Sequence, residues 1–234
     1  KWSSKKSKWK LFLVVLLENN RTQIENNTKE SMSGIICSIK NYYYFNFKIN
    51  VLELGCGVGR MIGILAKENP IGNYWGIDYS YQMLKQGHDF WVENKTILLD
   101  LSHKGFSSVH LPGHELKNLN FGLAKAEKLP FRNESQDFVF SNFLLDRLKQ
   151  PLEGLKEMKR VLKRNGKIII ITPLNFLHKD HWQQFYPSVK LLQVIREIGF
   201  NVLEWEDNFT IEEPLDLRGN ALKWNCIGMV LQKS

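Results

Sequence analysis

Residues Val51–Ser80 read VLELGCGVGRMIGILAKENPIGNYWGIDYS and show the pattern of a complete βαβ unit. The unit begins with a short apolar run, Val51–Leu54, of the kind that forms a buried strand. Three glycines at alternate positions follow, and then apolar residues at helical spacing. A second strand is predicted over Tyr74–Ile77, and it ends on Asp78. We therefore expect an α/β protein whose chain is arranged around this unit.

The turn after the first strand is suited to a nucleotide-like ligand. Glycine lets the backbone approach a ligand closely, because a Cβ at Gly55, Gly57 or Gly59 would occupy the ligand's space. Asp78 follows the next strand, where a carboxylate can accept hydrogen bonds from a ribose diol. The dinucleotide fingerprint G-x-G-x-x-G would need a small residue where this chain has Arg60. The sequence therefore argues against a nicotinamide-dependent oxidoreductase.

Length and composition indicate one globular α/β domain with a substantial core. The chain has 234 residues, 43% of them hydrophobic and 24% charged. Its formal net charge is +8, but five lysines within the first ten residues leave only +3 for the remainder. The basic start is interpreted either as an unstructured tail or as a contact with anionic lipid or nucleic acid. The near-neutral remainder argues against extensive phosphate binding, so we expect no nucleic-acid partner.

The cysteines and the apolar start favour a cytoplasmic protein. Cys37, Cys56 and Cys226 lack C-x-x-C spacing, so we expect reduced thiols, with neither a disulfide framework nor a metal site. The apolar run Leu11–Leu17 has seven residues and no small-residue cleavage site after it, unlike a signal peptide. It is also too short to span a bilayer. We expect no membrane span, and the sequence gives no indication of the oligomeric state.

The remaining chain is divided as follows. Residues 1–47 are predicted to be an N-terminal helical extension, and residues 48–234 the main domain. Ser80 is a candidate N-cap for a helix that buries Met83, Leu84, Phe90 and Trp91. Residues 95–118 are longer than a connection needs and are interpreted as an insertion, serving either as a lid or as decoration. Further strands are predicted over 120–124, 137–141, 167–172, 200–206 and 223–232, further helices over 153–162 and 188–198, and a tight turn at Asn165-Gly166.

Three segments carry a resemblance to a known family. Glu53–Gly59, ELGCGVG, resembles motif I of the class I S-adenosylmethionine methyltransferases. Ala126–Phe131, AEKLPF, and Lys156–Ile170, KEMKRVLKRNGKIII, resemble the methyltransferase type 11 group, which includes the ubiquinone/menaquinone C-methyltransferases. The resemblance covers roughly residues 48–172, and more loosely the rest. It implies a Rossmann-like doubly wound seven-stranded sheet, mostly parallel with an antiparallel last strand, and helices on both faces.

The resemblance also implies S-adenosylmethionine as cofactor and a set of residues that hold it. Asp78 would bind the ribose hydroxyls, and Tyr79 would flank the adenine. The other implied positions are Glu53, Gly55, Cys56, Gly57 and Gly59 in the glycine loop, Ala126 and Glu127 at the adenine, and Asn142 and Phe143 at the methionine. Lys125 departs from the family, which usually has an acid there to accept from the adenine amino group. Adenine recognition would then fall to the Ala126 backbone, to Glu127 or to a different register.

The function predicted from the resemblance is methyl transfer to an O, N or C nucleophile of a small molecule. Asp146, His178 and His181 are candidate catalytic bases, because their loops should lie near the ligand-binding edge. The D/N-P-P-Y/F signature of amide and exocyclic amine methylation is absent, since Ser141–Leu144 occupies its place. The aromatic residues of 174–187 favour an apolar or aromatic acceptor. The alternative is a non-catalytic, methyltransferase-like binding or partner subunit, which Lys125 motivates.

Overall fold

The computed structural model describes residues 48–234 apart from 101, 103–104 and 106. The helical extension predicted over 1–47, which includes Cys37, lies outside the described residues. The chain divides into two compact units. The described residues of the larger unit are 48–95, 113–207 and 227–234, and those of the smaller unit fall within 96–112 and 208–226.

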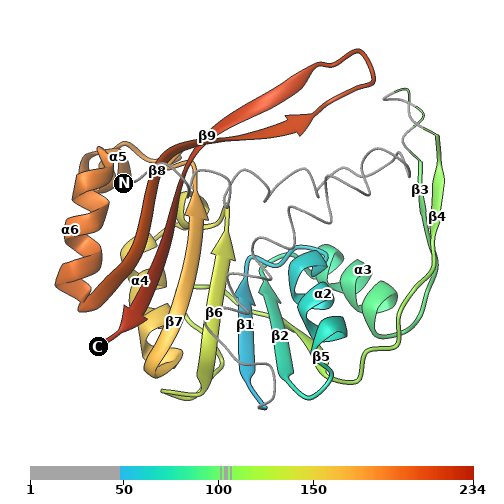
Figure 1. The fold of residues 1–234 in the computed structure, drawn as a ribbon, viewed down its shortest axis with the longest axis horizontal. Coiled ribbons are helices and arrows are strands. Elements are labelled where there is room, and N and C mark those ends of the chain that lie inside the picture. The colour runs from blue at the N-terminus through green and yellow to red at the C-terminus, as the bar shows by residue number, and fades with distance from the viewer. Residues whose placement is uncertain (1–47, 101, 103–104, 106) are drawn as a thin grey trace, which may run out of the picture. The chain divides into compact units, whose positions relative to one another are not determined.

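The larger unit is built on a seven-stranded sheet with the strand order β5-β2-β1-β6-β7-β9-β8 (Figure 1). Its strands are β1 (Asn50–Leu54), β2 (Asn73–Asp78), β5 (Leu119–Leu123), β6 (Gln136–Asn142), β7 (Leu162–Thr172), β8 (Phe200–Pro214) and β9 (Ala221–Lys233). The pairs β1–β2, β1–β6, β2–β5 and β6–β7 are parallel, whereas β9 runs antiparallel to β7. This order confirms the predicted doubly wound sheet with an antiparallel last strand.

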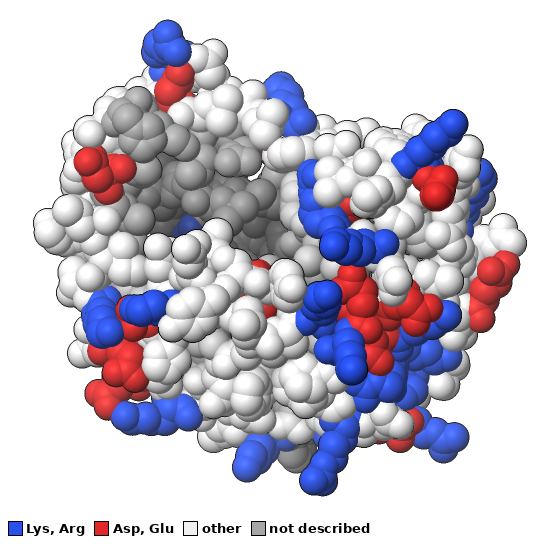
Figure 2. Space-filling model, turned by 180° about the vertical axis from the view of Figure 1, so that it is seen from behind, with Lys and Arg blue, Asp and Glu red and all other residues white. Residues whose placement is uncertain are grey.

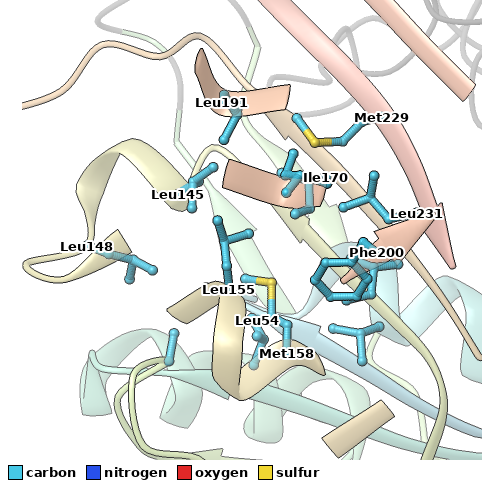
Figure 3. Close-up of a cluster of buried hydrophobic side chains, with 14 of the residues drawn as sticks. Leu54, Leu145, Leu148, Leu155, Met158, Ile170, Leu191, Phe200, Met229 and Leu231 are labelled. Carbon is cyan, nitrogen blue, oxygen red and sulfur yellow. The ribbon is translucent and has the colours of Figure 1, made fainter. Parts of the chain in front are cut away.

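Helices cover both faces of this sheet. They are α2 (Arg60–Glu68), α3 (Tyr81–Trp91), α4 (Pro151–Val161), α5 (Lys179–Phe185) and α6 (Ser188–Ile198), with a 3-10 turn η3 at Leu145–Arg147. Leu54 and Ile170 share one core with Leu155 of α4 and Leu191 of α6 (Figure 3). The neighbouring Ile169 is equally buried but lies outside that core, because successive strand side chains point to opposite faces.

Several predicted element ends are confirmed and two details are wrong. The Ser80 hydroxyl accepts from the Met83 backbone N–H at 3.4 Å and caps α3, and Gly199 ends α6 at φ 88°. Met83, however, is 45% exposed, and the buried face of α3 consists of Leu84, Gly87 and Trp91. The turn predicted at Asn165-Gly166 lies within β7, where Asn165 has φ 59° and the register with β6 shifts. A left-handed Asn can be accommodated as an irregularity inside a strand as well as in a turn.

The smaller unit contains short antiparallel structure. Within it, β3 (Ile97–Leu99) pairs with β4 (Val109–Leu111) in a two-stranded sheet. The outer ends of β8 and β9 also belong to this unit, and Lys223 and Glu212 form an ion pair there at 2.9 Å. The short strands β3 and β4 both lie within residues 95–118, which are interpreted as an insertion. The insertion boundary and the lid role stay predictions.

The surface carries mixed charges. Acidic and basic side chains lie beside one another in several clusters on the face that Figure 2 shows. On α4, Lys156 pairs with Glu153 at 2.7 Å, and Arg160 pairs with Glu157 at 2.5 Å. The exposed Lys156–Glu153 pair contributes little to stability, whereas Arg160 is partly buried and also donates to the carbonyls of Leu129 and Phe131. Among the helices that the structure describes, none has the length and apolar character needed to cross a membrane.

Candidate cofactor-binding site

The glycine loop between β1 and α2 is tied to the end of β2. The backbone N–H groups of Gly55 and Cys56 both donate to the Ile77 carbonyl, at 2.8 and 3.1 Å. Gly55, Gly57 and Gly59 have φ angles of 70°, 55° and 71°, in the left-handed region that favours glycine. The loop therefore turns sharply at the carboxyl end of the parallel strands.

The three glycines meet different surroundings. A Cβ at Gly59 would lie 2.4 Å from the Phe121 ring, so this glycine is needed for packing inside the protein. A Cβ at Gly57 would have no atom within 4 Å among the described residues. Gly57 therefore presents bare backbone to open space, as expected where a ligand approaches the loop.

Asp78 is held in place by two backbone N–H groups. Its Oδ2 accepts from Gly57 and its Oδ1 accepts from Ser80, both at 2.8 Å. Each carboxylate oxygen retains a further lone pair, so the group can still accept hydrogen bonds from a diol. The glycine loop and the carboxylate thus form one preorganised unit.

Glu53 and Cys56 lie beneath this unit rather than on its surface. Glu53 is 4% exposed, and its Oε2 accepts from the backbone N–H of Ile62 at 3.0 Å. Burial raises the pKa of Glu53 well above its usual value, and the charge of Asp78 adds to this. Burial likewise raises the pKa of the Cys56 thiol, which makes it a poor nucleophile. Both residues support the loop from inside.

A cavity of about 380 Å³ opens beside Asp78. It brings together five of the residues predicted for the cofactor, namely Gly55, Asp78, Tyr79, Ala126 and Glu127. It also contains residues that the sequence analysis did not assign, namely Ile77, Ala124, Lys125, Leu144, Arg147, Leu148, Lys149 and Gln150. Those from 144 to 150 follow β6, so the carboxyl end of that strand was the available signal for them.

The outer rim of the cavity is aromatic and positively charged. Tyr79 is 70% exposed, and the Lys125 ammonium lies over its ring, 5.3 Å from the centroid. Across the opening, the Glu127 carboxylate accepts from the Lys149 backbone N–H at 3.2 Å. Arg147 and Lys149 add two further cations to the lining.

Asn142 and Phe143 end β6 beside the glycine loop but are not part of the cavity wall. The Phe143 backbone has φ 55°, and its N–H donates to the Ile171 carbonyl at 2.8 Å. The Asn142 Oδ1 is buried and has no hydrogen-bond partner among the described residues. An unpaired buried acceptor at the end of a central strand is suited to a donor from a ligand.

A second cleft, of about 520 Å³, lies between α4 and α6. Its cations already have partners: the Lys159 ammonium donates to the Ile198 carbonyl at 2.6 Å, and that of Lys233 donates to the Leu162 carbonyl at 2.7 Å. These residues join elements of the fold to one another. The smaller cavity, which lies at the strand ends, is therefore the better candidate.

The three predicted bases lie apart from the cavity wall. Asp146 is 1% exposed, and its oxygens accept from the Thr172 hydroxyl and the Asn175 backbone N–H, both at 3.2 Å. Burial raises its pKa, and the neighbouring Arg147 opposes that rise. The structure therefore shows Asp146 joining η3 to the end of β7.

The two histidines lie on the segment that follows β7. His178 precedes α5 and is exposed, and its ring centroid is 5.3 Å from that of His181. The His181 Nδ1 is buried without a partner among the described residues. In the described part of the chain, three or more His, Cys, Asp or Glu side chains nowhere gather as a metal site would require.

Comparison with known proteins settles the family. The family model described as "Methyltransferase domain", of the type 11 group, matches residues 52–170, just over half of the chain. This chain belongs to that methyltransferase family. The matched residues include the glycine loop, Asp78 and the segment after β5 that together form the cavity.

The named relatives of this methyltransferase share about 30% of their residues with it over the matched part. The malonyl-acyl-carrier-protein O-methyltransferase of Marinomonas sp. is 31% identical over 166 residues, which cover 65% of this chain and 53% of the relative. The ubiquinone/menaquinone biosynthesis C-methyltransferase of Geotalea daltonii is 30% identical over 170 residues, covering 70% of this chain and 63% of the relative. The chain thus spans between half and two thirds of the length of these relatives.

Solved structures confirm the fold. A SAM-dependent methyltransferase from Aquifex aeolicus matches with a TM-score of 0.52 at 20% identity, covering 84% of this chain and 89% of that one. A TehB-like SAM-dependent methyltransferase from Corynebacterium glutamicum matches with a TM-score of 0.53 at 14% identity, covering 87% of each chain. At these identities the likeness concerns the fold alone.

Family membership implies S-adenosylmethionine as the cofactor, and the residues fit it. Gly57 leaves room for a ligand at the loop, and Asp78 offers carboxylate lone pairs next to it. The buried Asn142 oxygen has no donor in the part of the chain that the structure describes. A nucleoside joined to an amino acid supplies hydroxyls and an ammonium group that match these acceptors.

Proposed function

We propose that this chain transfers the sulfonium methyl group of S-adenosylmethionine to an O, N or C nucleophile of a small molecule. The observation that best supports this function is the position of the Asp78 carboxylate. It accepts from the Gly57 N–H and lines a cavity next to the glycine loop. The family match supports the same reading. Residues 48–234 would form the methyltransferase domain and 1–47 an extension before it.

The proposed roles follow the order of the strands. Gly55, Gly57 and Gly59 would hold the amino-acid part of the cofactor against the loop, and Asp78 would accept from the ribose hydroxyls. Tyr79 offers an exposed ring to the base, and the buried Ala126 lines the same cavity. Asn142 and Phe143 would border the methionine end, while Glu53 and Cys56 would hold the loop from below.

The chemistry asks little of the protein beyond alignment. The bound cofactor supplies a methyl group already activated by its positive sulfur. The protein's part is to hold the acceptor in line with that group and to exclude water from the cavity. A base is required only when the acceptor carries a proton with a high pKa.

The sequence candidates for that base are unequal in the structure. Asp146 is buried and both of its oxygens are engaged, so it would act by positioning the end of β7. His178 is exposed at the start of α5 and is the more accessible candidate. Aromatic side chains of the same segment, including Phe176, Trp182 and Tyr186, favour an apolar or aromatic acceptor.

The proposal is tested by calorimetric titration of the full chain with S-adenosylhomocysteine, the demethylated cofactor. Asp78→Ala should raise the Kd roughly 100-fold, since hydrogen bonds to a charged group contribute about 1.5–3 kcal/mol each. Asp89→Ala is the matched control, because this acid on α3 pairs with Lys85 and Lys95 and does not line the cavity. A wild-type chain that does not bind the ligand would contradict the proposal.

Binding alone leaves the partner-subunit alternative standing, so a second assay is needed. The chain is incubated with a donor carrying an isotopically labelled methyl group and a set of small phenols, amines and quinols. Transfer of label that is lost in Asp78→Ala supports the enzyme. Tight binding with no transfer to any of these acceptor classes would favour the non-catalytic subunit.

A further inference from the structure

The segment after β5 forms a closed turn that contributes to the cavity wall. The Lys128 backbone N–H donates to the Lys125 carbonyl at 3.1 Å, which closes the turn. Ala126 and Glu127, in the middle of the turn, both line the cavity beside Asp78. The shape of this part of the cavity therefore depends on how the turn is held.

Leu129, the residue after the turn, is held by two side chains of α4. Its backbone N–H donates to the Glu157 Oε2 at 2.7 Å, and its carbonyl accepts from the Arg160 Nη2 at 3.0 Å. The Arg160 Nη1 also donates to the Phe131 carbonyl and to the Asn133 Oδ1, both at 2.8 Å. The chain directly after the turn is therefore tied to one helix through both backbone and side-chain groups.

The two α4 side chains also hold each other. The Nε and Nη2 of Arg160 donate to the two carboxylate oxygens of Glu157, at 2.5 and 2.8 Å. Such bidentate pairs are among the stronger hydrogen-bonded contacts in proteins. The Arg160 guanidinium keeps the pKa of Glu157 below its usual value, so the carboxylate is charged at neutral pH while it accepts from Leu129. A lysine cannot reproduce this arrangement, because an ammonium group lacks the planar fork of donors.

The helix that carries this pair is fixed independently of the turn. Leu155 and Met158 of α4 are fully buried in the core that packs on the sheet (Figure 3), and Val161 belongs to the same core. These apolar contacts place α4 without help from Arg160 or Glu157. The polar pair therefore transmits the position of a rigid helix to the turn.

We propose that Arg160 and Glu157 are positioning residues for the base of the cofactor, because they fix the turn that carries Ala126 and Glu127. The inference rests on the proposed function, in which this turn borders the adenine. Neither Arg160 nor Glu157 lines the cavity, so both act through the turn rather than by contact with the cofactor.

The test compares two ligands by calorimetric titration of the full chain. S-adenosylhomocysteine carries the base, whereas S-ribosylhomocysteine has the amino acid and the ribose without it. Arg160→Lys should raise the Kd for S-adenosylhomocysteine about 10-fold, the size of one lost hydrogen bond to the base, and that for S-ribosylhomocysteine less than about twofold. Asp78→Ala should by contrast weaken both ligands, because both carry the ribose.

Arg196→Lys is the matched control. Arg196 is an exposed residue of α6 that lines neither the cavity nor the second cleft, so this change should leave both Kd values unaltered. If Arg160→Lys fails to fold, Glu157→Gln is measured in the same way. It keeps an oxygen for the Leu129 N–H but loses the charge that holds Arg160, so the two ligands should again respond unequally.

Hydrogen exchange of the ligand-free chain supplies a second readout. Arg160→Lys should speed the exchange of the amides of residues 126–131 and leave that of the glycine loop, residues 55–59, unchanged. The inference is overturned if both Kd values rise together, if neither rises, or if exchange at the turn stays as in the wild type. Each of these results leaves the proposed function intact. Failure of the wild type to bind S-adenosylhomocysteine would instead overturn the proposed function itself.

Discussion

At the scale of single residues, Gly57 and Gly59 differ in what requires a glycine. The position of Gly57 suits the approach of a ligand, whereas packing inside the protein requires Gly59. Both have left-handed backbone, which costs a residue with a Cβ about 1–2 kcal/mol. Only Gly59 faces a neighbour, because its Cβ would lie 2.4 Å from Phe121. The Gly57 Cβ would meet no atom of the described residues within 4 Å.

Gly57→Ala should therefore lower the free energy of unfolding by only about 1–2 kcal/mol while weakening S-adenosylhomocysteine binding at least 10-fold. Gly59→Ala should cost about 2–5 kcal/mol in unfolding free energy, because overpacking adds to the backbone strain. Urea denaturation and calorimetric titration measure the two effects. Undiminished binding by Gly57→Ala would show that the loop does not hold the cofactor.

Single residues also show which features of the site could be predicted from the sequence and which could not. The glycines and Asp78 could be assigned because their spacing fixes both the turn and the strand end. The hydrogen bonds that hold Asp146 could not be predicted in the same way, because its partners Thr172 and Asn175 are distant in sequence. Lys125 was seen as a departure from the family, but its partner Tyr79 required the fold.

At the scale of elements, Glu53 joins β1 to the first turn of α2. Its carboxylate is buried and accepts from the Ile62 N–H. The hydrogen bond that links the strand to the helix therefore depends on a group that can be protonated. The folded-state pKa of Glu53 is raised by burial above the value of an exposed glutamate. In the pH range between these two pKa values the folded chain binds more protons than the unfolded one, so stability falls as pH rises.

Glu53→Gln removes this titration and keeps an oxygen that can accept from Ile62. The unfolding free energy of the variant relative to the wild type should therefore increase as pH rises from the unfolded-state pKa of about 4.3. Asp146 also has a raised pKa, but it is present in both proteins and cancels in the difference. Denaturant titrations of both proteins from pH 5 to pH 8 measure this difference in unfolding free energy. A difference that stays constant or shrinks would mean that Glu53 is ionised in the folded chain at no cost.

Element prediction succeeded where the pattern was long and failed where tertiary pairing decided the ends. The apolar run Ile168–Ile171 predicts a central strand, and β7 contains it. The start of β7 at Leu162 was not predicted, because Asn165-Gly166 has the local signature of a turn and only pairing with β6 makes it part of a strand. Similarly, β8 and β9 extend beyond their predicted ranges into a unit that the periodicity did not reveal.

At the scale of the whole molecule, the strand order followed from the family resemblance, whereas the division into two units did not. The excursion Thr96–Pro112 belongs to the smaller unit, but the residues on either side of it are joined within the larger one. The Asn94 N–H donates to the His114 carbonyl at 2.9 Å, and the His114 N–H donates to the Phe90 carbonyl at 2.7 Å. The larger unit therefore closes its own chain across the base of the excursion.

Replacing Thr96–Pro112 with two glycines should accordingly leave the larger unit folded. Shortening a loop lowers its closure entropy by about 0.6 kcal/mol per halving of length, which offsets part of the loss of β3 and β4. We expect the unfolding free energy to change by no more than about 2 kcal/mol and the Kd for S-adenosylhomocysteine to stay within about threefold, because the cavity beside Asp78 is lined by residues of the larger unit. A Gly/Ser segment of the original length is the control that separates loss of the side chains from loss of length. A shortened chain that folds but binds the ligand more than about threefold more weakly than the wild type would contradict this prediction. If it fails to fold while the control folds, the length of the connection is what the larger unit requires.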